Sequence, residues 1–503
     1  MRKKTTQLLK LTHQLLLLLS ITFSDSLSFS DTPVRSRSSA KKVVWFRNHG
    51  LRIRDNEALY RAVEDAAVGN VGHSILPVYL WNQQQQTNDD DKKRSNDIND
   101  DIHLADYGGG TASEVFIANT LHHLNHTSLH GSLTAGLCTT ATTPKHIVNE
   151  LTSICSQMEA TEVYYLEPAV PSSATFEDDL RTLLLEQGIT PYSYRSGCSL
   201  LDYNKNPPPW KDIVLEHPWR SPLIPFVDYI LRELDWQPPA APLPEPCNLE
   251  QLLDMNNKEV RFSKPLFIED VLRCIGKSGG GTEWGESIAK LWPASEEDAA
   301  EALRVFLTSI KDENDVEDEK NYAEDTDDAE INTTEKRTHL ASKLSPYLAR
   351  GVLTSRQVYH AMAELRDQSN YASFVRRICW RDYTVAVASL FPDVIGESRA
   401  IRDGYNSSYD ASLDEDELKL LKKWKDGATG FPLIDAGMRQ LVVEGWMPQK
   451  VRLAVSSFLV EGMGISWKAG MQHFEEYLVD FDASINANMW MNAGCVGFDP
   501  VSL

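Results

Sequence analysis

The first two hundred residues alternate between short apolar segments and longer amphipathic ones. The apolar segments are typical of buried strands, whereas apolar residues that recur every three or four positions predict helices. Strands are expected at 43–46, 74–81, 132–137, 162–166 and 192–194, with helices between them at 58–67, 113–130, 145–159 and 176–187. Strands that alternate with helices at this spacing predict a doubly wound, parallel α/β sheet over residues 42–203.

The pattern changes after residue 203. Prolines concentrate in residues 204–250, within PPPW, HPWRSPLIPF and WQPPAAPLPEP, and predict an extended linker with short helical pieces. Beyond this linker no strand-like alternation remains, and helices are expected at 283–310, 342–363 and 371–390. The sequence therefore predicts an all-α domain over residues 251–503.

Two internal stretches are too polar to form part of a core. Residues 83–101 are rich in Gln, Asn and Asp, which predicts a disordered insertion. Residues 311–330 form an acidic insertion, in which positions 312–330 alone carry eleven carboxylates. This insertion supplies much of the formal net charge of −22, so the net charge does not exclude a basic groove elsewhere.

The first 41 residues predict a targeting presequence. Arg2, Lys3 and Lys4 precede an apolar run over residues 15–23 that is too short to span a bilayer, and a basic, Ser-rich stretch follows. We expect an organelle, in the first place a plastid reached through the secretory route, and no membrane anchor in the mature chain. The secretory pathway, a mitochondrion, and a disordered start without an address are the alternatives.

Cysteine and histidine spacing gives no metal site. The seven cysteines are scattered without a CxxC pair, which indicates reduced thiols in an intracellular compartment. His122, His123, His126 and His130 lie near one helical face, but no carboxylate or cysteine joins them at useful spacing. A solvated helix face explains them better than a metal.

Two segments of the helical domain could bind a ligand, although each has an ordinary structural explanation. In SKLSPYLARG, the hydroxyls of Ser342 and Ser345 and the free N–H groups of a helix start suit a phosphate, but Ser before Pro is also common helix capping. In SFVRRICWRDYTVA, Trp380 and Arg381 place an aromatic ring beside a charge pair. A core tryptophan with a surface ion pair would give the same pattern.

The stretch 424–495 is the densest in tryptophan and carries the acidic cluster DFDASIN. Arg452 and Asp480 are a plausible buried pair, because buried acids need partners. Asp482 could accept a hydrogen bond from a ligand's hydroxyl or ring N–H, and Asn486 lies one helical turn further on the same face. The stretch therefore indicates a site for a large planar ligand.

Long parts of the chain resemble the photolyase/cryptochrome family. VVWFRNHGLRIRDNEAL resembles its first strand and turn, SKLSPYLARGVLTSRQV its flavin-phosphate segment, and WKDGATGFPLIDAGMRQLVVEGWM with ISWKAGMQHFEEYLVDFDASINANMW its FAD-binding core. The resemblance implies an α/β antenna domain followed by a helical domain that holds FAD in a U-shape at the bottom of a cavity. It allows for an antenna chromophore of unknown identity, since no motif in the α/β domain indicates one. It also implies a FAD domain that continues past FDPVSL, where this chain ends.

The resemblance implies roles for single residues on the flavin side. The phosphate segment corresponds to Ser342, Leu344 and Ser345, and the flavin contacts correspond to Arg452, Asp480, Asp482 and Asn486. Asn486 matches the residue facing flavin N5 and has no proton to give, which favours an anionic or fully reduced flavin. Trp490 and Trp467 match the first two tryptophans of an electron-transfer chain; the third is missing, and Tyr405 or Tyr409 could replace it.

The substrate side departs from the family's pattern. Trp380 and Arg381 match its cavity-side pair, but Arg377 replaces the acid that contacts a thymine dimer, and Asn492 replaces a stacking tryptophan. WMPQ places Pro448 and Gln449 where thymine-dimer photolyases have His and Asn. Gln449 could still bind a base, and Arg377 with Lys450 could hold phosphate.

Three hypotheses follow from these matches and departures. The first is a cryptochrome-like photoreceptor, in which light-driven electron transfer is sensed by a signalling protein. The alternative is a DNA photolyase, in which reduced FAD repairs an ultraviolet-induced pyrimidine lesion in damaged or single-stranded DNA. The third is a truncated relative that no longer retains flavin.

Overall fold

The computed structural model describes residues 41–67, 74–82, 111–138, 143–169, 175–200, 223–236, 238–254, 260–266, 282–313, 341–365, 369–390 and 413–497. These residues belong to one compact unit, residues 40–503. Four features expected from the sequence lie outside the described residues: the presequence, the insertion 83–101, most of the acidic insertion 311–330, and the pair Tyr405 and Tyr409. None of the helices in the described segments is long and apolar enough to cross a membrane.

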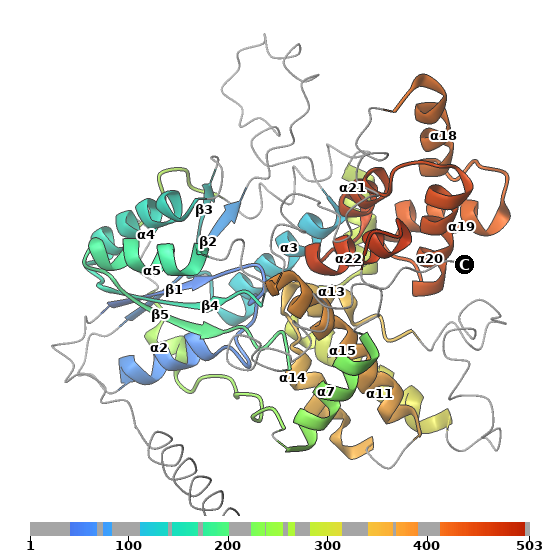
Figure 1. The fold of residues 1–503 in the computed structure, drawn as a ribbon. Helices are drawn as coiled ribbons and strands as arrows, with labels where there is room; N and C mark the ends of the chain where they lie inside the picture. Colours follow the sequence, from blue (N-terminus) through green and yellow to red (C-terminus); the bar gives the residue numbers. More distant parts are fainter. Residues whose placement is uncertain are drawn as a thin grey trace, which may run out of the picture. The chain divides into compact units, whose positions relative to one another are not determined.

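The N-terminal region is a five-stranded parallel sheet with the strand order β3-β2-β1-β4-β5 (Figure 1). The strands are β1 (Lys41–Phe46), β2 (Ser74–Asn82), β3 (Thr134–Cys138), β4 (Glu162–Glu167) and β5 (Thr190–Arg195). All four pairings are parallel, and in the register Val44 lies opposite Pro77 on one side and Tyr164 on the other. The predicted doubly wound sheet is confirmed, with each strand within two residues of its expected position.

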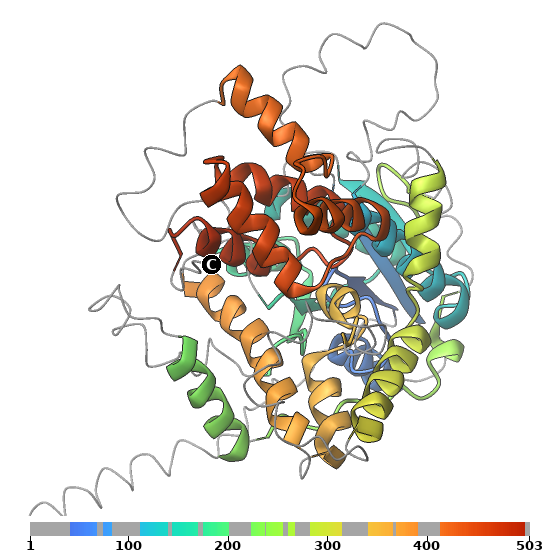
Figure 2. The same ribbon diagram turned by 90° about the vertical axis from the view of Figure 1, so that its right-hand side faces the viewer.

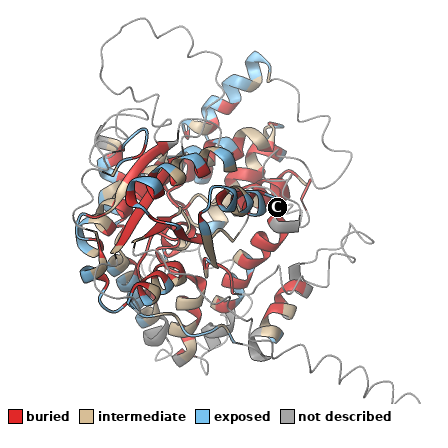
Figure 3. Cartoon of the chain, turned by 90° about the vertical axis from the view of Figure 1, so that its left-hand side faces the viewer, coloured by how far each residue is buried: buried red, intermediate tan, exposed pale blue. Residues whose placement is uncertain are grey.

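Helices cover both faces of this sheet. Val43 and Trp45 of β1 point into a core made with α4 (Pro144–Met158) and α5 (Phe176–Glu186). Val44 and Phe46 point into the opposite core, made with α2 (Glu57–Ala67) and α3 (Ala112–His123). The inner strands are therefore buried on both faces, as Figure 3 shows in red, which explains their continuous apolar sequences.

The helical region is built of helices, as the sequence predicts, but two of the expected helices are each divided into two shorter ones. The helix expected at 283–310 is two helices, α10 (Thr282–Leu291) and α11 (Glu296–Glu313), because Pro293 has no N–H and disfavours a helical residue before it. The segment 342–363 also holds two helices, α13 (Ser345–Arg350) and α14 (Ser355–Ala361). Gly351 separates them with a φ of 64°, and a Cβ there would overlap the carbonyl group of His49. The third expected helix is α15 (Ser369–Leu390).

The helices that follow the sheet in the sequence pack into two hydrophobic cores. The first extends from the sheet and includes α7 (Leu223–Trp236), a helix within the predicted linker, whose Phe226 contacts Tyr383 of α15. The second belongs to residues 413–496 and surrounds Trp424, Trp467 and Trp490. Its helices, drawn in orange and red in Figure 2, are α18 (Glu415–Lys425), α19 (Pro432–Glu444), α20 (Gln449–Ser457), α21 (Trp467–Tyr477) and α22 (Ala483–Ala493).

The loop after β1 ties the sheet to the helical region. The guanidinium of Arg52, which is fully buried, donates to the carbonyl oxygens of Gly351 at 2.8 Å, Asp55 at 2.7 Å and Ser196 at 2.5 Å. Asp55 in turn accepts from the Thr354 hydroxyl at 2.7 Å and pairs with Arg356. These contacts explain the polar sequence RNHGLRIRDN directly after a buried strand.

Candidate functional site

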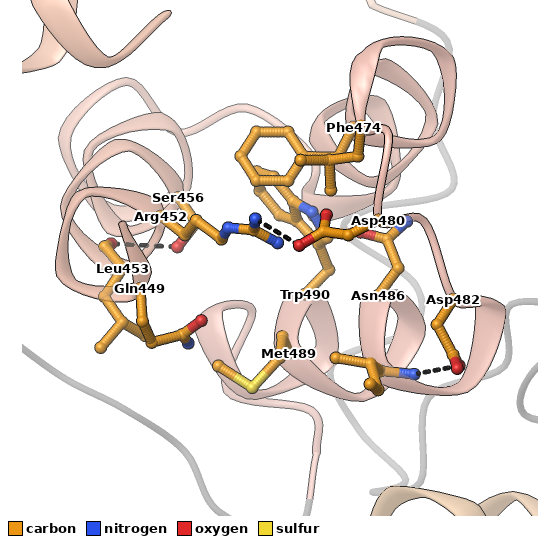
Figure 4. Close-up of a pocket in the computed structure, with 12 residues that line it drawn as sticks. Gln449, Arg452, Leu453, Ser456, Phe474, Asp480, Asp482, Asn486, Met489 and Trp490 are labelled. Carbon is orange, nitrogen blue, oxygen red and sulfur yellow. Dashed lines mark hydrogen bonds and ion pairs between the residues drawn. The ribbon is translucent and has the colours of Figure 1, made fainter. Parts of the chain in front are cut away.

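A cleft opens between α20, α21 and α22. Its empty volume is about 470 Å³, including the part open to solvent. Figure 4 shows side chains from all three helices and from the turn between α21 and α22 pointing toward it. The lining residues are Gln449, Arg452, Leu453, Ser456, Phe474, Leu478, Asp480, Asp482, Ile485, Asn486, Met489 and Trp490.

Arg452 and Asp480 form the ion pair that the sequence indicates. Arg452 Nη2 lies 2.8 Å from Asp480 Oδ2, and Arg452 Nε donates to the Met447 carbonyl at 3.0 Å. Asp480 is buried, and its second oxygen, Oδ1, has no hydrogen-bond partner among the described residues. A buried carboxylate oxygen without a partner is costly, so Asp480 Oδ1 is ready to accept an N–H or O–H from a ligand.

Asp482 connects the cleft to α22 and to α15. Its Oδ1 caps the start of α22 by accepting from the Ser484 hydroxyl at 2.5 Å and from the Ser484 N–H at 3.1 Å. Its Oδ2 lies 3.0 Å from Arg381 Nη2. Burial alone would raise the pKa of Asp482, but Arg381 and the Ser484 hydroxyl outweigh it and lower the pKa, so this carboxyl is an anion.

Asn486 presents a hydrogen-bond acceptor to the cleft. Its Nδ2 donates to the Met471 carbonyl at 3.0 Å, which fixes the amide group and leaves its oxygen available. The side chain has no titratable proton. A ligand atom beside Asn486 would therefore find an acceptor and no acid.

The two predicted electron-transfer tryptophans are held by reciprocal packing of α21 and α22. The six-membered ring of Trp490 lies over Gly470, where a Cβ would overlap its atoms Cη2 and Cζ3. The indole of Trp467 lies over Gly494, where a Cβ would stand 2.6 Å from Cδ1. Both indoles are almost fully buried, and only Trp490 lines the cleft.

The cleft fits the flavin that the resemblance implies. Arg452 offers a fixed positive charge, Asp480 Oδ1 and the Asn486 oxygen offer acceptors for N–H and hydroxyl groups, and Phe474 and Trp490 offer aromatic surface. An isoalloxazine ring with a ribityl chain presents both kinds of partner. The donor set contains no cluster of metal-binding side chains, and none occurs elsewhere in the described segments.

Six predicted site residues line the cleft, and the others lie outside its lining. Ser345 accepts from Trp446 Nε1 at 3.3 Å, and Leu344 is buried. Trp380 and Arg377 are exposed on α15, while Asn492 is buried on α22. The residues brought together are Gln449, Arg452, Asp480, Asp482, Asn486 and Trp490; those outside are Ser342, Leu344, Ser345, Arg377, Trp380, Arg381, Asn492 and Trp467.

The α/β region also contributes charge and packing near the cleft, which the sequence did not predict. His49 follows β1 and lies within the field of Asp482, Arg350 and Arg381; burial lowers its pKa to about 4, so the imidazole is neutral. Arg350 is buried as well, and its Nη2 donates to the Phe481 carbonyl at 2.9 Å, next to Asp482. The position of His49 could have indicated this contribution, because loops at the carboxyl ends of parallel strands commonly reach ligand sites.

Comparison with known proteins gives two family matches. Residues 42–203 match the family described as DNA photolyase, and residues 374–503 match the FAD binding domain of DNA photolyase. The second match contains every residue that lines the cleft. The cleft therefore lies in an FAD-binding domain, and the predicted cofactor FAD is confirmed.

The similar proteins include both photolyases and cryptochromes. A deoxyribodipyrimidine photo-lyase of Alkalihalophilus pseudofirmus is 40% identical over 161 residues, which are 32% of this chain and 32% of that protein. Cryptochrome-2 of Arabidopsis thaliana is 26% identical over 466 residues, which are 90% of this chain and 64% of that protein. The matches span less than two thirds of either relative's length.

Among solved structures, a bacterial class III photolyase from Agrobacterium tumefaciens has the same fold. Its TM-score is 0.67 at 24% identity, with 93% of this chain and 83% of that chain covered. The two-part architecture predicted from the sequence is thereby confirmed.

Proposed function

Because the chain belongs to the photolyase/cryptochrome family, we propose that it is a cryptochrome-like photoreceptor, which absorbs blue light with FAD and responds by electron transfer through its own aromatic residues. Bound FAD would supply light absorption and one-electron chemistry. The chain's own residues would orient the cofactor, set the charge around it and provide the electron.

Four residues of the cleft have a definite part in this proposal. Arg452 stabilises negative charge on the ligand, and Asp480 accepts from it while held in place by the same arginine. Asn486 accepts a hydrogen bond without donating an acidic proton. Trp490, buried against the cleft, is the nearest aromatic electron donor.

The photoreceptor proposal rests on where the expected base-contacting residues lie. An enzyme that acts on an extruded base holds that base between aromatic or apolar surfaces and reads its edge with hydrogen bonds. Of the expected base-contacting residues, only Gln449 lines the cleft; Trp380 is 46% exposed on α15 and Asn492 is 6% exposed within α22. Among the described residues, the expected flavin contacts that line the cleft therefore outnumber the expected base contacts, of which Gln449 alone lines it.

The test is to express the chain without its first 41 residues and to measure bound flavin, photoreduction and DNA repair. We expect a flavin absorption spectrum, reduction of the flavin under blue light, and no restoration of ultraviolet-damaged DNA. The variant Arg452→Met should lose flavin, and Leu453→Met should keep it, because both side chains line the same cleft but only Arg452 pairs with Asp480. Repair of damaged DNA by the unmodified chain would refute the photoreceptor role.

The second candidate is a DNA photolyase. It is supported by the 40% identity to a photo-lyase over 161 residues and by the exposed Arg376 and Arg377 beside Trp380, which could hold a phosphate backbone. If this candidate is right, damaged single- or double-stranded DNA should bind, and Arg377→Gln should weaken that binding and its salt dependence. The absence of binding to any damaged DNA would remove it.

We also propose that the chain acts in a plastid. The proposal is supported by the basic, apolar and Ser-rich order of the first 41 residues. Fusion of this segment to a fluorescent protein should direct the fusion into plastids. Secretion or retention in the cytosol would contradict the proposal.

A further inference from the structure

A line of touching rings leaves Trp490 on the side away from the cleft. We propose that it is the electron-supply route of this protein, running from Tyr477 past His473 to Trp424 and Trp490, and that Tyr477 is the residue finally oxidised. The inference rests on the proposed function, in which photoexcited, oxidised flavin withdraws one electron. It identifies the end of the electron route, which the sequence leaves open.

The ring distances support a continuous route. The centroids of Trp490 and Trp424 lie 6.1 Å apart, those of Trp424 and His473 5.5 Å, and those of His473 and Tyr477 4.7 Å. Trp490, Trp424 and His473 are buried, whereas Tyr477 is half-buried and lies 6.0 Å from the half-buried Trp284. Because electron transfer slows steeply with distance, rings in contact from the cleft to the protein surface are a favourable path.

The predicted second relay residue, Trp467, is less well placed. Its ring contacts no other aromatic ring among the described residues, and it packs instead against Gly494. The ammonium group of Lys468 lies 5.8 Å from its ring centroid. A lysine also acts on the proposed route, since Lys425 helps to lower the pKa of His473, so the ring contacts of Trp424 decide between the two tryptophans.

His473 suits the route because it carries no charge. Both of its ring nitrogens are buried and without hydrogen-bond partners in the described segments, and burial lowers its pKa to about 3. A neutral imidazole does not repel positive charge on Trp424, and its ring lies between Trp424 and Tyr477. His473 thus places one uncharged ring between the two donors, Trp424 and Tyr477.

Tyr477 ends the route for a chemical reason. When the phenol gives up one electron its O–H bond breaks, the proton passes to water at the exposed edge, and a neutral tyrosyl radical remains. The electron would pass through Trp424 and Trp490 to bound flavin, which would be the oxidant. Burial and the nearby carboxylates of Glu476 and Asp426 raise the pKa of Tyr477, so the phenol keeps its proton until the electron leaves.

The test is flash spectroscopy and electron paramagnetic resonance on the FAD-loaded chain and four variants. We expect a tyrosyl radical after a blue flash, which is lost in Tyr477→Phe and in Trp424→Phe. Trp284→Phe, which keeps Tyr477, and Trp467→Phe, which removes only the other tryptophan, should retain it. Growth of the protein on deuterated tyrosine should change the hyperfine structure of the signal without altering any contact.

A second measurement does not depend on the flavin. In the flavin-free chain an ultraviolet flash absorbed by tryptophan ionises it directly, and the yield of tyrosyl radical should fall in Tyr477→Phe but stay at the wild-type level in Trp467→Phe. A chain that binds and photoreduces FAD equally well with Tyr477→Phe, or that loses photoreduction with Trp467→Phe, would refute the route and leave the proposed function intact. A chain that holds no flavin would refute the proposed function, and the ultraviolet experiment would still decide the route.

Discussion

A single methyl group added at Gly470 should disturb both the packing of the core and the binding of FAD in the cleft. The Cβ of Gly470→Ala would overlap the Trp490 ring and lie 2.8 Å from Leu459 Cδ2, whereas carbon atoms in good contact are about 3.5–4.0 Å apart. Trp490 cannot rotate away, because the rings of Trp424 and Phe474 lie 6.1 and 4.9 Å from its own. Overpacking of this kind costs about 1–3 kcal/mol, and the rigidity of the surroundings favours the upper end of that range.

The helix propensity of alanine offsets part of this cost. Replacing a mid-helix glycine gains about 1 kcal/mol, so the free energy of unfolding should fall by about 2 kcal/mol. Denaturant unfolding measures this change, and fluorescence titration measures FAD affinity, which should fall because Trp490 lines the cleft.

The matched control is Gly494→Ala. Its Cβ would press on Trp467, which lies outside the cleft lining, so this variant should lose stability but keep its FAD affinity. The reasoning is wrong if Gly470→Ala unfolds at the same denaturant concentration as the wild type, or if both variants lose FAD equally.

Three further predictions concern charge and burial. Asp480→Asn should lower the free energy of unfolding by about 3 kcal/mol and weaken FAD binding, because Arg452 loses its partner; equilibrium unfolding and flavin titration check both effects. His473→Phe should raise the free energy of unfolding by about 1–3 kcal/mol, since it replaces a buried ring whose nitrogens have no partners among the described residues, and a lower unfolding midpoint would contradict this. The pKa of His49 is about 4 in the folded chain, below the ordinary histidine value of 6.5; its contribution to stability is fully present above pH 6.5 and decreases as the pH falls towards 4, by up to about 3 kcal/mol. Unfolding curves at successive pH values should show this loss, and His49→Gln should reduce it.

The sheet was predictable from the sequence because both of its faces are buried. β1 and β4 are almost continuously apolar, and each helix between strands shows a clear amphipathic period. The pair Arg452 and Asp480 was predictable for a similar reason, since an acid within an apolar helical stretch needs a partner.

Other features depend on contacts between distant segments. The break between α10 and α11 could have been predicted from Pro293, but the position of Gly351 is fixed by His49, about three hundred residues earlier. The ring contacts of Trp424 and the burial of His473 are set by how α18, α21 and α22 pack together. No local pattern indicates which tryptophans of a helical bundle will touch.

The contacts of Arg52 also limit when its loop can fold during synthesis. Its guanidinium binds the carbonyl oxygen of Gly351, which lies 299 residues further along the chain. At about 5–20 residues per second, roughly 15–60 s pass between the synthesis of Arg52 and that of its partner. Throughout that interval the nascent sheet holds an arginine whose carbonyl partner in the helical region has not yet been made, so this loop cannot close while the sheet is being synthesised.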